Sequence, residues 1–211
     1  MTRAKYPVKL NRFTNWRELS QILRTKSIEL RDTSGWDDKN DINVIKEYEK
    51  HKGKKVLVKC FCASSETIYH WTDFAKNIDG CCIQFDPQKL LKSIDSVKSN
   101  IKHDWVNYEY IKFVESKRPN LEQFPFTKRK PYHIENEYRI IWLGPPNTII
   151  KEIPINLDCI VKITFSYKMS QARFNARRKY LRKLLKRTPD ELKIVHSTVI
   201  ENKRWIKAFQ Y

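Results

Sequence analysis

Two glutamates separated by one residue, Glu135 and Glu137, have the types and spacing that best suit chemistry in this chain. They precede residues 138–143, a β-branched and aromatic run that residues 144–146 (Gly-Pro-Pro) stop, so this segment predicts a buried strand. Residues two apart on an extended chain point to the same side, and we expect both carboxyl groups to project together. Two carboxylates held that close raise the pKa of one of them. The pair suits acid–base chemistry or stabilisation of a cation; the structural alternative is a solvated strand end with Arg139 as ion-pair partner.

The segments that must position this pair predict an α+β fold. Strands are expected at residues 6–13, 27–31, 56–62, 81–85, 137–143, 149–155, 159–166 and 192–200. Helices are expected after Thr14, through Ile42, Ile45 and Tyr48 to Gly53, over residues 68–75, from Asp86 and Pro87, and over residues 170–187. Residues 100–127 give no clear pattern. Because strands and helices do not alternate strictly, we expect a mixed or mostly antiparallel sheet with packed helices in a single domain, residues 1–211.

The charge balance is the strongest bulk property of the chain. Its 42 basic and 24 acidic side chains give a formal net charge of +18. Such a field attracts polyanions and speeds their encounter, so nucleic acid, RNA or DNA, is the expected partner. The chain is also rich in Lys, Asn and Ile, a bias found in proteins of AT-rich genomes, and part of the charge is explained that way.

Much of that charge lies in one stretch. Residues 159–189 contain no acidic residue and ten Lys or Arg. On a helical wheel the apolar side chains of residues 170–187 fall on one face, namely Phe174, Tyr180, Leu181, Leu184 and Leu185. The other face carries the cations Arg178, Lys179, Arg182, Lys183 and Lys186. This cationic ridge is predicted to follow a phosphate backbone, and a merely solvated face is the alternative.

Other patterns exclude several classes of protein. Four glycines, with neither GxGxxG nor GxxxxGK[ST], argue against a glycine-rich phosphate loop. The five cysteines are odd in number, and Cys60-x-Cys62 and Cys81-Cys82 are poor zinc spacings, so buried thiols in a reduced compartment are expected. No signal peptide is evident, and no apolar segment approaches the roughly 20 residues of a membrane span. We therefore expect a cytoplasmic protein with no membrane contact.

Four segments resemble, in the same order along the chain, those of a bacterial and phage family of domains of unknown function, often found near mobile or defence genes. With the two longest given first, they are His70-Trp71-Thr72-Asp73-Phe74-Ala75 through Gly80-Cys81-Cys82-Ile83-Gln84-Phe85-Asp86, Lys130 through Glu135-Asn136-Glu137-Tyr138-Arg139, residues 36–41, and residues 58–62. In the last two segments the family's Pro is missing and Cys62 stands where Ser is usual. The resemblance covers residues 10–165, whereas residues 166–211, the basic helix and a strand, lie outside it. It implies a toxin or phage-defence role with an antitoxin or defence partner protein.

A more distant resemblance concerns the order of polar residues. An arginine near the first strand, a serine after a later strand and E-x-E before another are similar to the arginine-serine-glutamate ADP-ribosyltransferases. That resemblance implies an ADP-ribosyltransferase-like sheet and NAD as substrate. It implies that Arg12 holds the NAD phosphates and that Ser64 or Ser65 braces the nicotinamide side. Glu137 would stabilise the ribosyl cation, and Glu135 would orient or deprotonate the acceptor.

Three hypotheses therefore stand. The first is an NAD-dependent transferase acting on nucleic acid or a nucleic-acid-associated target, and the second is a non-catalytic nucleic-acid-binding module. The third is a metal-dependent nuclease that combines Asp37, Asp38 and Asp41 with the two glutamates. No cysteine or histidine pattern predicts a resident metal site.

Overall fold

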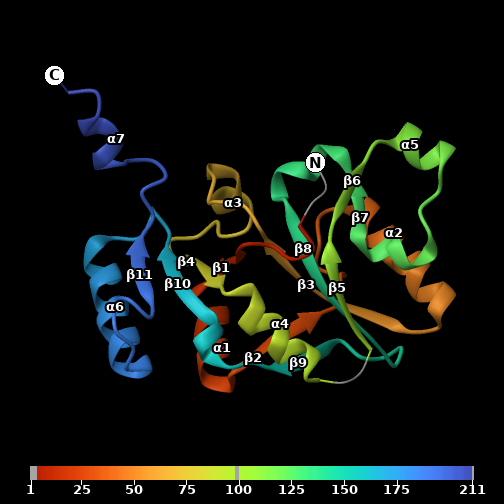
Figure 1. Ribbon diagram of the computed structural model, residues 1–211, viewed down its shortest axis with the longest axis horizontal. Helices are drawn as coiled ribbons and strands as arrows, with labels where there is room; N and C mark the ends of the chain where they lie inside the picture. The colour runs from red at the N-terminus through yellow and green to blue at the C-terminus, as the bar shows by residue number, and fades with distance from the viewer. Residues whose placement is uncertain (1–3, 98–99, 211) are drawn as a thin grey trace.

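The computed structural model describes residues 4–97 and 100–210 of the chain. These residues form a nine-stranded sheet, a separate two-stranded sheet and helices packed on the large sheet (Figure 1). Seven strands follow the order β11-β10-β4-β1-β3-β2-β9, and β8 and β5 extend from β3. Within the described ranges β10 and β11 are a parallel pair, as are β6 and β7. The predicted α+β class with a mixed, mostly antiparallel sheet is confirmed.

The bounds of the elements are as follows. The strands are β1 (Leu10–Asn15), β2 (Ser27–Arg31), β3 (Lys55–Cys62), β4 (Gly80–Phe85), β5 (Ile101–Trp105), β6 (Asn107–Glu109), β7 (Thr127–Arg129), β8 (Glu137–Gly144), β9 (Ile150–Pro154), β10 (Ile160–Phe165) and β11 (Lys193–His196). The α-helices are α1 (Trp16–Thr25), α2 (Lys39–Lys52), α3 (Ile68–Asp73), α4 (Pro87–Asp95), α5 (Ile111–Ser116), α6 (Gln171–Leu185) and α7 (Lys203–Lys207). Short 3-10 helices are η1 (Leu121–Phe126), η2 (Lys130–Glu135) and η3 (Leu157–Cys159).

Strand β3 pairs with three other strands of the large sheet, β1, β2 and β8. Along one edge it pairs antiparallel with β8 over its whole length, from Lys55 to Cys62. It also pairs with β1 at Asn11↔Cys62 alone and with β2 at Arg31↔Val58 alone. The two single pairings leave the middle of β3 without a ladder partner on that side. The sheet is therefore split between β1 and β2, next to the predicted site.

Alternation along β3 and β8 sends apolar side chains to two faces. Leu57, Phe61 and Ile140 belong to the larger core, which α1, α4 and α6 cover with Leu19, Ile22, Leu90, Leu91, Phe174 and Leu181. The opposite face carries Val56, Val58, Ile141 and Leu143 under α2 and η1. A third cluster joins Phe13 and Cys62 to Trp71 of α3. At the N-terminal end of β8, the residues on the same face as Ile141 and Leu143 are charged: they are Glu137 and Arg139.

Capping residues set where several helices begin and end. Asp38 accepts hydrogen bonds from the N–H groups of Asn40 and Asp41 to begin α2, and Gly53 ends it at φ 59°. Asp86 caps α4, and Pro87 occupies its first turn, as predicted. Helix α1 begins after Asn15 rather than Thr14, because the Asn15 side chain accepts from Glu18 N–H.

The chain differs from expectation mainly at its C-terminal end. The strand expected at residues 192–200 is only β11, Lys193–His196, and the chain then leaves the body to form α7 (Figure 1). Of the predicted apolar face of α6, Phe174 and Leu181 are buried, while Tyr180 and Leu184 are 54% and 47% exposed. In the described parts of the chain, no helix combines the length and apolar character needed to cross a membrane.

Candidate functional site

A cavity of about 490 Å³ lies at the split in the sheet, where β1, β3 and β8 meet the segments before α2 and β8. Its wall combines charged side chains with aromatic ones. It is lined by Asn11, Arg12, Phe13, Gly35, Trp36, Asp37, Asp38, Cys60, Phe61, Cys62, Tyr69, Asp73, Phe74, Lys128, Tyr132, Glu135, Glu137 and Arg139. Both predicted glutamates and Arg12 therefore face one space.

Glu135 and Glu137 reach the cavity by a different path from the one expected. Glu135 ends η2, and β8 begins only at Glu137. Between them Asn136 is left-handed at φ 42°, so the backbone turns instead of running straight. Tyr108 accepts a hydrogen bond from Glu137 N–H at 2.9 Å and fixes the start of the strand. The carboxyl groups thus converge because of the turn, not because of strand alternation.

At this end of the cavity the side chains of Arg139 and Lys128 pair with three carboxyl groups. These belong to Glu135, Glu137 and Asp41. Arg139, fully buried on β8, donates to Glu137 Oε1 at 2.7 Å and to Asp41 Oδ2 at 2.5 Å. Lys128 of β7 lies 2.7 Å from Glu135 Oε2 and 3.9 Å from Glu137 Oε2. Arg139 also donates to the Pro125 carbonyl at 2.9 Å, which leaves none of its nitrogens without a partner. Arg139 is therefore the structural ion-pair partner that the sequence suggested.

The surroundings of the two glutamates shift their pKa values in opposite directions. Burial raises the pKa of Glu135 to about 7, against the opposing charge of Lys128. Burial acts on Glu137 in the same direction, but Arg139 and Lys128 outweigh it and lower its pKa to about 2. One pKa of the pair is raised, as predicted. Near neutral pH Glu137 is an anion, whereas Glu135 exchanges a proton.

Arg12 lies in the gap between the diverging strands. Its Nη1 donates to the Cys60 carbonyl at 3.3 Å, a group that the single β1–β3 pairing leaves open. Its Nε donates to Glu18 Oε1 at 3.2 Å, and Glu18 also pairs with the buried Lys59. Arg12 borders a second cavity of about 430 Å³ as well. The two cavities share Arg12, Gly35, Trp36 and Cys60, so this guanidinium can contact a ligand that extends from one into the other.

The two predicted serines lie beside the cavity rather than in its wall. Ser64 is half-buried, accepts from Asn11 Nδ2 through its carbonyl at 2.7 Å, and lies 3.1 Å from Cys62 Sγ through its hydroxyl. Ser65 is exposed, lies three residues past the end of β3 and accepts from Lys9 Nζ at 2.8 Å. Along the chain Ser64 lies two residues, and Ser65 three residues, after Cys62, the nearest residue that lines the cavity.

The acidic turn before α2 lies in the same region. Asp37 and Asp38 border the cavity, and Asp41 is buried against Arg139. Here the guanidinium of Arg139 lies between Asp41 and Glu137, so a cation of the chain already matches their charge. Within residues 4–97 and 100–210, no group of three or more His, Cys, Asp or Glu side chains is placed to hold a metal ion.

The cationic ridge lies on α6, at the other end of the sheet from α2 (Figure 1). Arg178, Lys179, Lys183 and Lys186 are exposed. Arg182 is half-buried and donates to the carbonyls of Arg187 and Thr188 at 3.0 Å, so it closes the end of the helix. Arg182 is the member of the predicted ridge that is least available to a phosphate.

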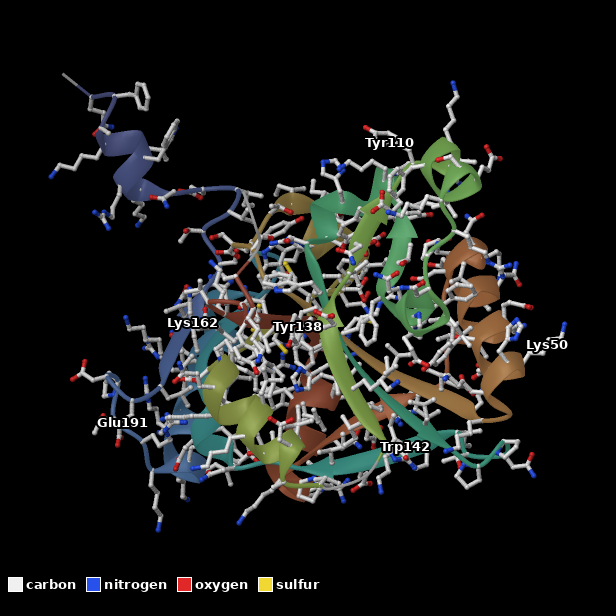
Figure 2. The ribbon with its side chains drawn as sticks, turned by 45° about the vertical axis from the view of Figure 1, so that its right-hand side comes forward. Lys50, Tyr110, Tyr138, Trp142, Lys162 and Glu191 are labelled. Carbon is white, nitrogen blue, oxygen red and sulfur yellow. The ribbon has the colours of Figure 1, made fainter. Side chains whose placement is uncertain are left out.

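Reversing Lys179, Lys183 and Lys186 to Glu should weaken nucleic-acid binding. The plot of log affinity against log salt should become shallower by about 0.9 for each phosphate that the protein no longer neutralises. Filter binding across a salt series measures both. The control variant reverses the charge of the exposed Lys46, Lys50 and Lys54, in or next to α2. These lie away from the ridge: Figure 2 shows Lys50 on the opposite side of the molecule from Lys162 and Glu191, which are near α6. Equal weakening by both triple variants would contradict a localised ridge.

Several residues of this site were not singled out by the sequence. Lys128 bridges the two glutamates from a three-residue strand in the segment with no clear pattern. Tyr69 of α3 donates to Glu135 Oε1 at 3.3 Å, and Trp36 lies under the Arg139 guanidinium at 5.2 Å. No spacing rule connects these residues, because they come from separate segments. The basic character of position 128, seven residues before Glu135, is the one local signal for Lys128.

No protein-family model matches the chain, and no curated protein matches it, so membership of the family of unknown function stays a prediction. Among solved structures the chain is similar to "Thermus sp. 2.9 DarT in complex with NAD+", with 12% identity, 90% of this chain and 96% of that chain covered, and a TM-score of 0.45. It is also similar to "Thermus sp. 2.9 DarT in complex with ADP-ribosylated ssDNA", with 11% identity, coverage of 92% and 97%, and a TM-score of 0.43.

Proposed function

We propose that this protein is an NAD-dependent ADP-ribosyltransferase that acts on nucleic acid or on a target bound to nucleic acid. One observation carries the proposal: two carboxyl groups with separated pKa values and Arg12 line one cavity. Departure of nicotinamide from NAD leaves positive charge on the ribose. A fixed anion in a partly desolvated cavity stabilises such a charge as it develops.

The pKa values assign the two carboxyl groups different roles. Glu137 stays ionised and suits electrostatic stabilisation of the ribosyl cation, while Arg139 holds its orientation through two hydrogen bonds. Glu135 titrates near neutrality and suits removal of a proton from the acceptor. This is the division of labour that the resemblance implied, and the role of each residue remains part of the proposal.

The cavity suits a dinucleotide in size and charge. Its volume of about 490 Å³ lies within the range of ligand pockets, roughly 300–1,000 Å³. Arg12 borders both this cavity and the second one, a position from which it can bind a pyrophosphate that joins two nucleoside halves. Asn11 lines the cavity too. Its side chain donates a hydrogen bond to the Ser64 carbonyl, which holds the segment with Ser64 and Ser65 next to the cavity wall.

The rate of ADP-ribosyl transfer should rise with pH through about 7. The pKa of Glu135 is raised, so below about pH 7 its carboxyl group carries a proton and cannot accept one from the substrate. Above that pH it is a competent base. A pH–rate profile of transfer measures the inflection, and Glu135→Gln should remove it. An unchanged inflection in that variant would assign the titration to another group.

The target is proposed from charge. A net charge of +18 and an exposed ridge on α6 favour a polyanion. A toxin or defence role, with an antitoxin or defence partner, remains the expectation that the sequence resemblance implied.

The test is to incubate the protein with NAD labelled in its adenylate half, together with RNA, single-stranded DNA, duplex DNA or protein, with and without EDTA. We expect nicotinamide release and transfer of label, both insensitive to EDTA. Cleavage of nucleic acid that EDTA stops, with NAD untouched, would instead support the nuclease hypothesis. Salt-sensitive binding with neither reaction would support a non-catalytic module.

A further inference from the structure

A thiol in the wall of the cavity is not used by the proposed reaction. Cys62 is the last residue of β3, is 7% exposed and lines the cavity. Its sulfur lies 3.2 Å from His70 Nε2 of α3. A histidine nitrogen at this distance forms a hydrogen bond with the sulfur.

The hydrogen bonds of His70 define what it does to the thiol. The Thr67 N–H donates to His70 Nδ1 at 3.2 Å as part of the cap of α3. Because Nδ1 accepts, the proton of the neutral imidazole is on Nε2, which donates to Cys62 Sγ. The Ser64 N–H donates to the same sulfur at 3.4 Å, and the Ser64 hydroxyl lies 3.1 Å away. Two N–H groups, those of His70 and Ser64, therefore point at the sulfur and would stabilise a thiolate there, while the thiol itself donates to the Ser64 carbonyl at 3.8 Å.

The position of Cys62 relative to Glu137 is fixed by strand register. The two residues are direct partners in the antiparallel β3–β8 pair and line the same cavity. Side chains directly opposite each other in such a pair have Cβ atoms about 4.5–5.5 Å apart. The register therefore places the side chains of Cys62 and Glu137 as neighbours in the wall of the cavity.

Cys60, two residues earlier on the same side of β3, provides a contrast. Its thiol is hydrogen-bonded to Glu137, and burial together with that carboxylate raises its pKa well above the usual value. Its proton is held by an anion, while the Cys62 sulfur accepts from two N–H groups and its thiol donates to the neutral Ser64 carbonyl. Burial also raises the pKa of Cys62 above its usual value and outweighs the hydrogen bonds from Ser64, which act in the opposite direction. Of the two thiols in the cavity wall, Cys62 is the better placed to become a nucleophile.

We propose that Cys62 accepts ADP-ribose from NAD, so that the protein modifies and thereby blocks its own cavity; this inference rests on the proposed function. The Cys62 sulfur forms a bond to C1 of the nicotinamide ribose, and the bond from that carbon to the nicotinamide nitrogen breaks. The bonding pair stays with the ring nitrogen, giving neutral nicotinamide, and the thiol proton leaves to solvent. No oxidant or further reactant is needed. Turnover with NAD should therefore slow with time as the adduct accumulates.

The experiment uses the full chain, adenylate-labelled NAD and no nucleic acid, followed by peptide mapping of the labelled protein. We expect one label on the peptide that contains Cys62, released by mercuric ion and stable to hydroxylamine, as a thioglycoside is. Cys62→Ser should lose the label, and with nucleic acid added as acceptor it should show a linear time course of nicotinamide release where that of the unchanged protein slows. Cys159→Ala, a buried cysteine outside both cavities, should label like the unchanged protein.

The result separates this inference from the proposed function. Nicotinamide release with no label on Cys62, or with label on Cys60, would overturn the self-modification and leave the transferase standing. Absence of nicotinamide release from a folded protein, with acceptor present, would overturn both. As a test of the donor geometry, His70→Gln keeps an N–H near the sulfur and should retain more labelling than His70→Leu. Equal labelling of these two variants would contradict the assigned role of His70.

Discussion

Replacing Glu137 with Gln should lower the rate of nicotinamide release by roughly 10²–10³-fold, the usual effect of removing one preorganised electrostatic group from a reacting centre. The amide has the shape of the carboxylate but no charge to set against the ribosyl cation. Glu137 is 4% exposed and has its pKa lowered to about 2, so the unchanged protein presents a full anion at any working pH. The effect should appear in kcat more than in KM, because the ground state of NAD carries no ribosyl cation.

Folding has to be separated from chemistry in this variant. Gln at position 137 leaves one side of the Arg139 guanidinium without an anionic partner. Thermal unfolding should therefore be measured beside the rates, and Glu115→Gln on exposed α5 serves as the surface control. A folded Glu137→Gln protein that consumes NAD at the original rate would remove this residue from the mechanism.

Arg139→Met should lower the free energy of unfolding by about 3–5 kcal/mol, the range found when one partner of a buried ion pair is removed. Arg139 is fully buried and donates to both Glu137 and Asp41, so its loss leaves two buried carboxylates facing each other. Lys128, 3.6 Å from Asp41, can compensate only in part. Chemical denaturation with urea measures the change.

The matched variants distinguish charge from hydrogen-bond geometry. Arg139→Lys keeps the charge but cannot form the two-sided fork to Glu137 and Asp41, and it should fall between the unchanged protein and Arg139→Met. Replacing Arg139 and Asp41 together, with Met and Leu, removes one buried anion and should restore part of the stability. Full stability of Arg139→Met alone would show that this cluster does not hold the fold together.

The elements that sequence reasoning located best are those with strong local signals. The run after Glu137 became β8, and residues 56–62 lie within β3, because both segments are predominantly apolar and contain several β-branched or aromatic residues. Gly53, Asp86 and Pro87 fixed helix ends through backbone conformation and capping, which depend on nearest neighbours alone. For the same reason the pairing of Glu135 with Glu137 in one cavity was predictable from adjacency.

What escaped prediction depends on distant parts of the chain. Strands β5, β6 and β7 are short, and β6 and β7 are set by their pairing with each other rather than by their own residues. Lys128 therefore could not be placed at the glutamates from spacing. The turn at Asn136 was also missed, since a non-glycine residue at φ 42° has no reliable sequence signal beyond the tolerance of Asn for that conformation. Tyr180 and Leu184 follow the helical period yet remain exposed, because the sheet under α6 ends near β11.

The register between β3 and β8 has a consequence for how the protein is made. Cys62 and its neighbours on β3 are translated long before Glu137 and Arg139, which β8 supplies. During synthesis the edge of β3 that pairs with β8 stays unpaired until the ribosome has released the chain past Gly144. Pairings between strands this far apart in sequence also form slowly. A nascent chain thus carries Arg12 and both cavity thiols but neither carboxylate. The proposed activity on NAD would therefore be absent from every product of translation that stops before β8.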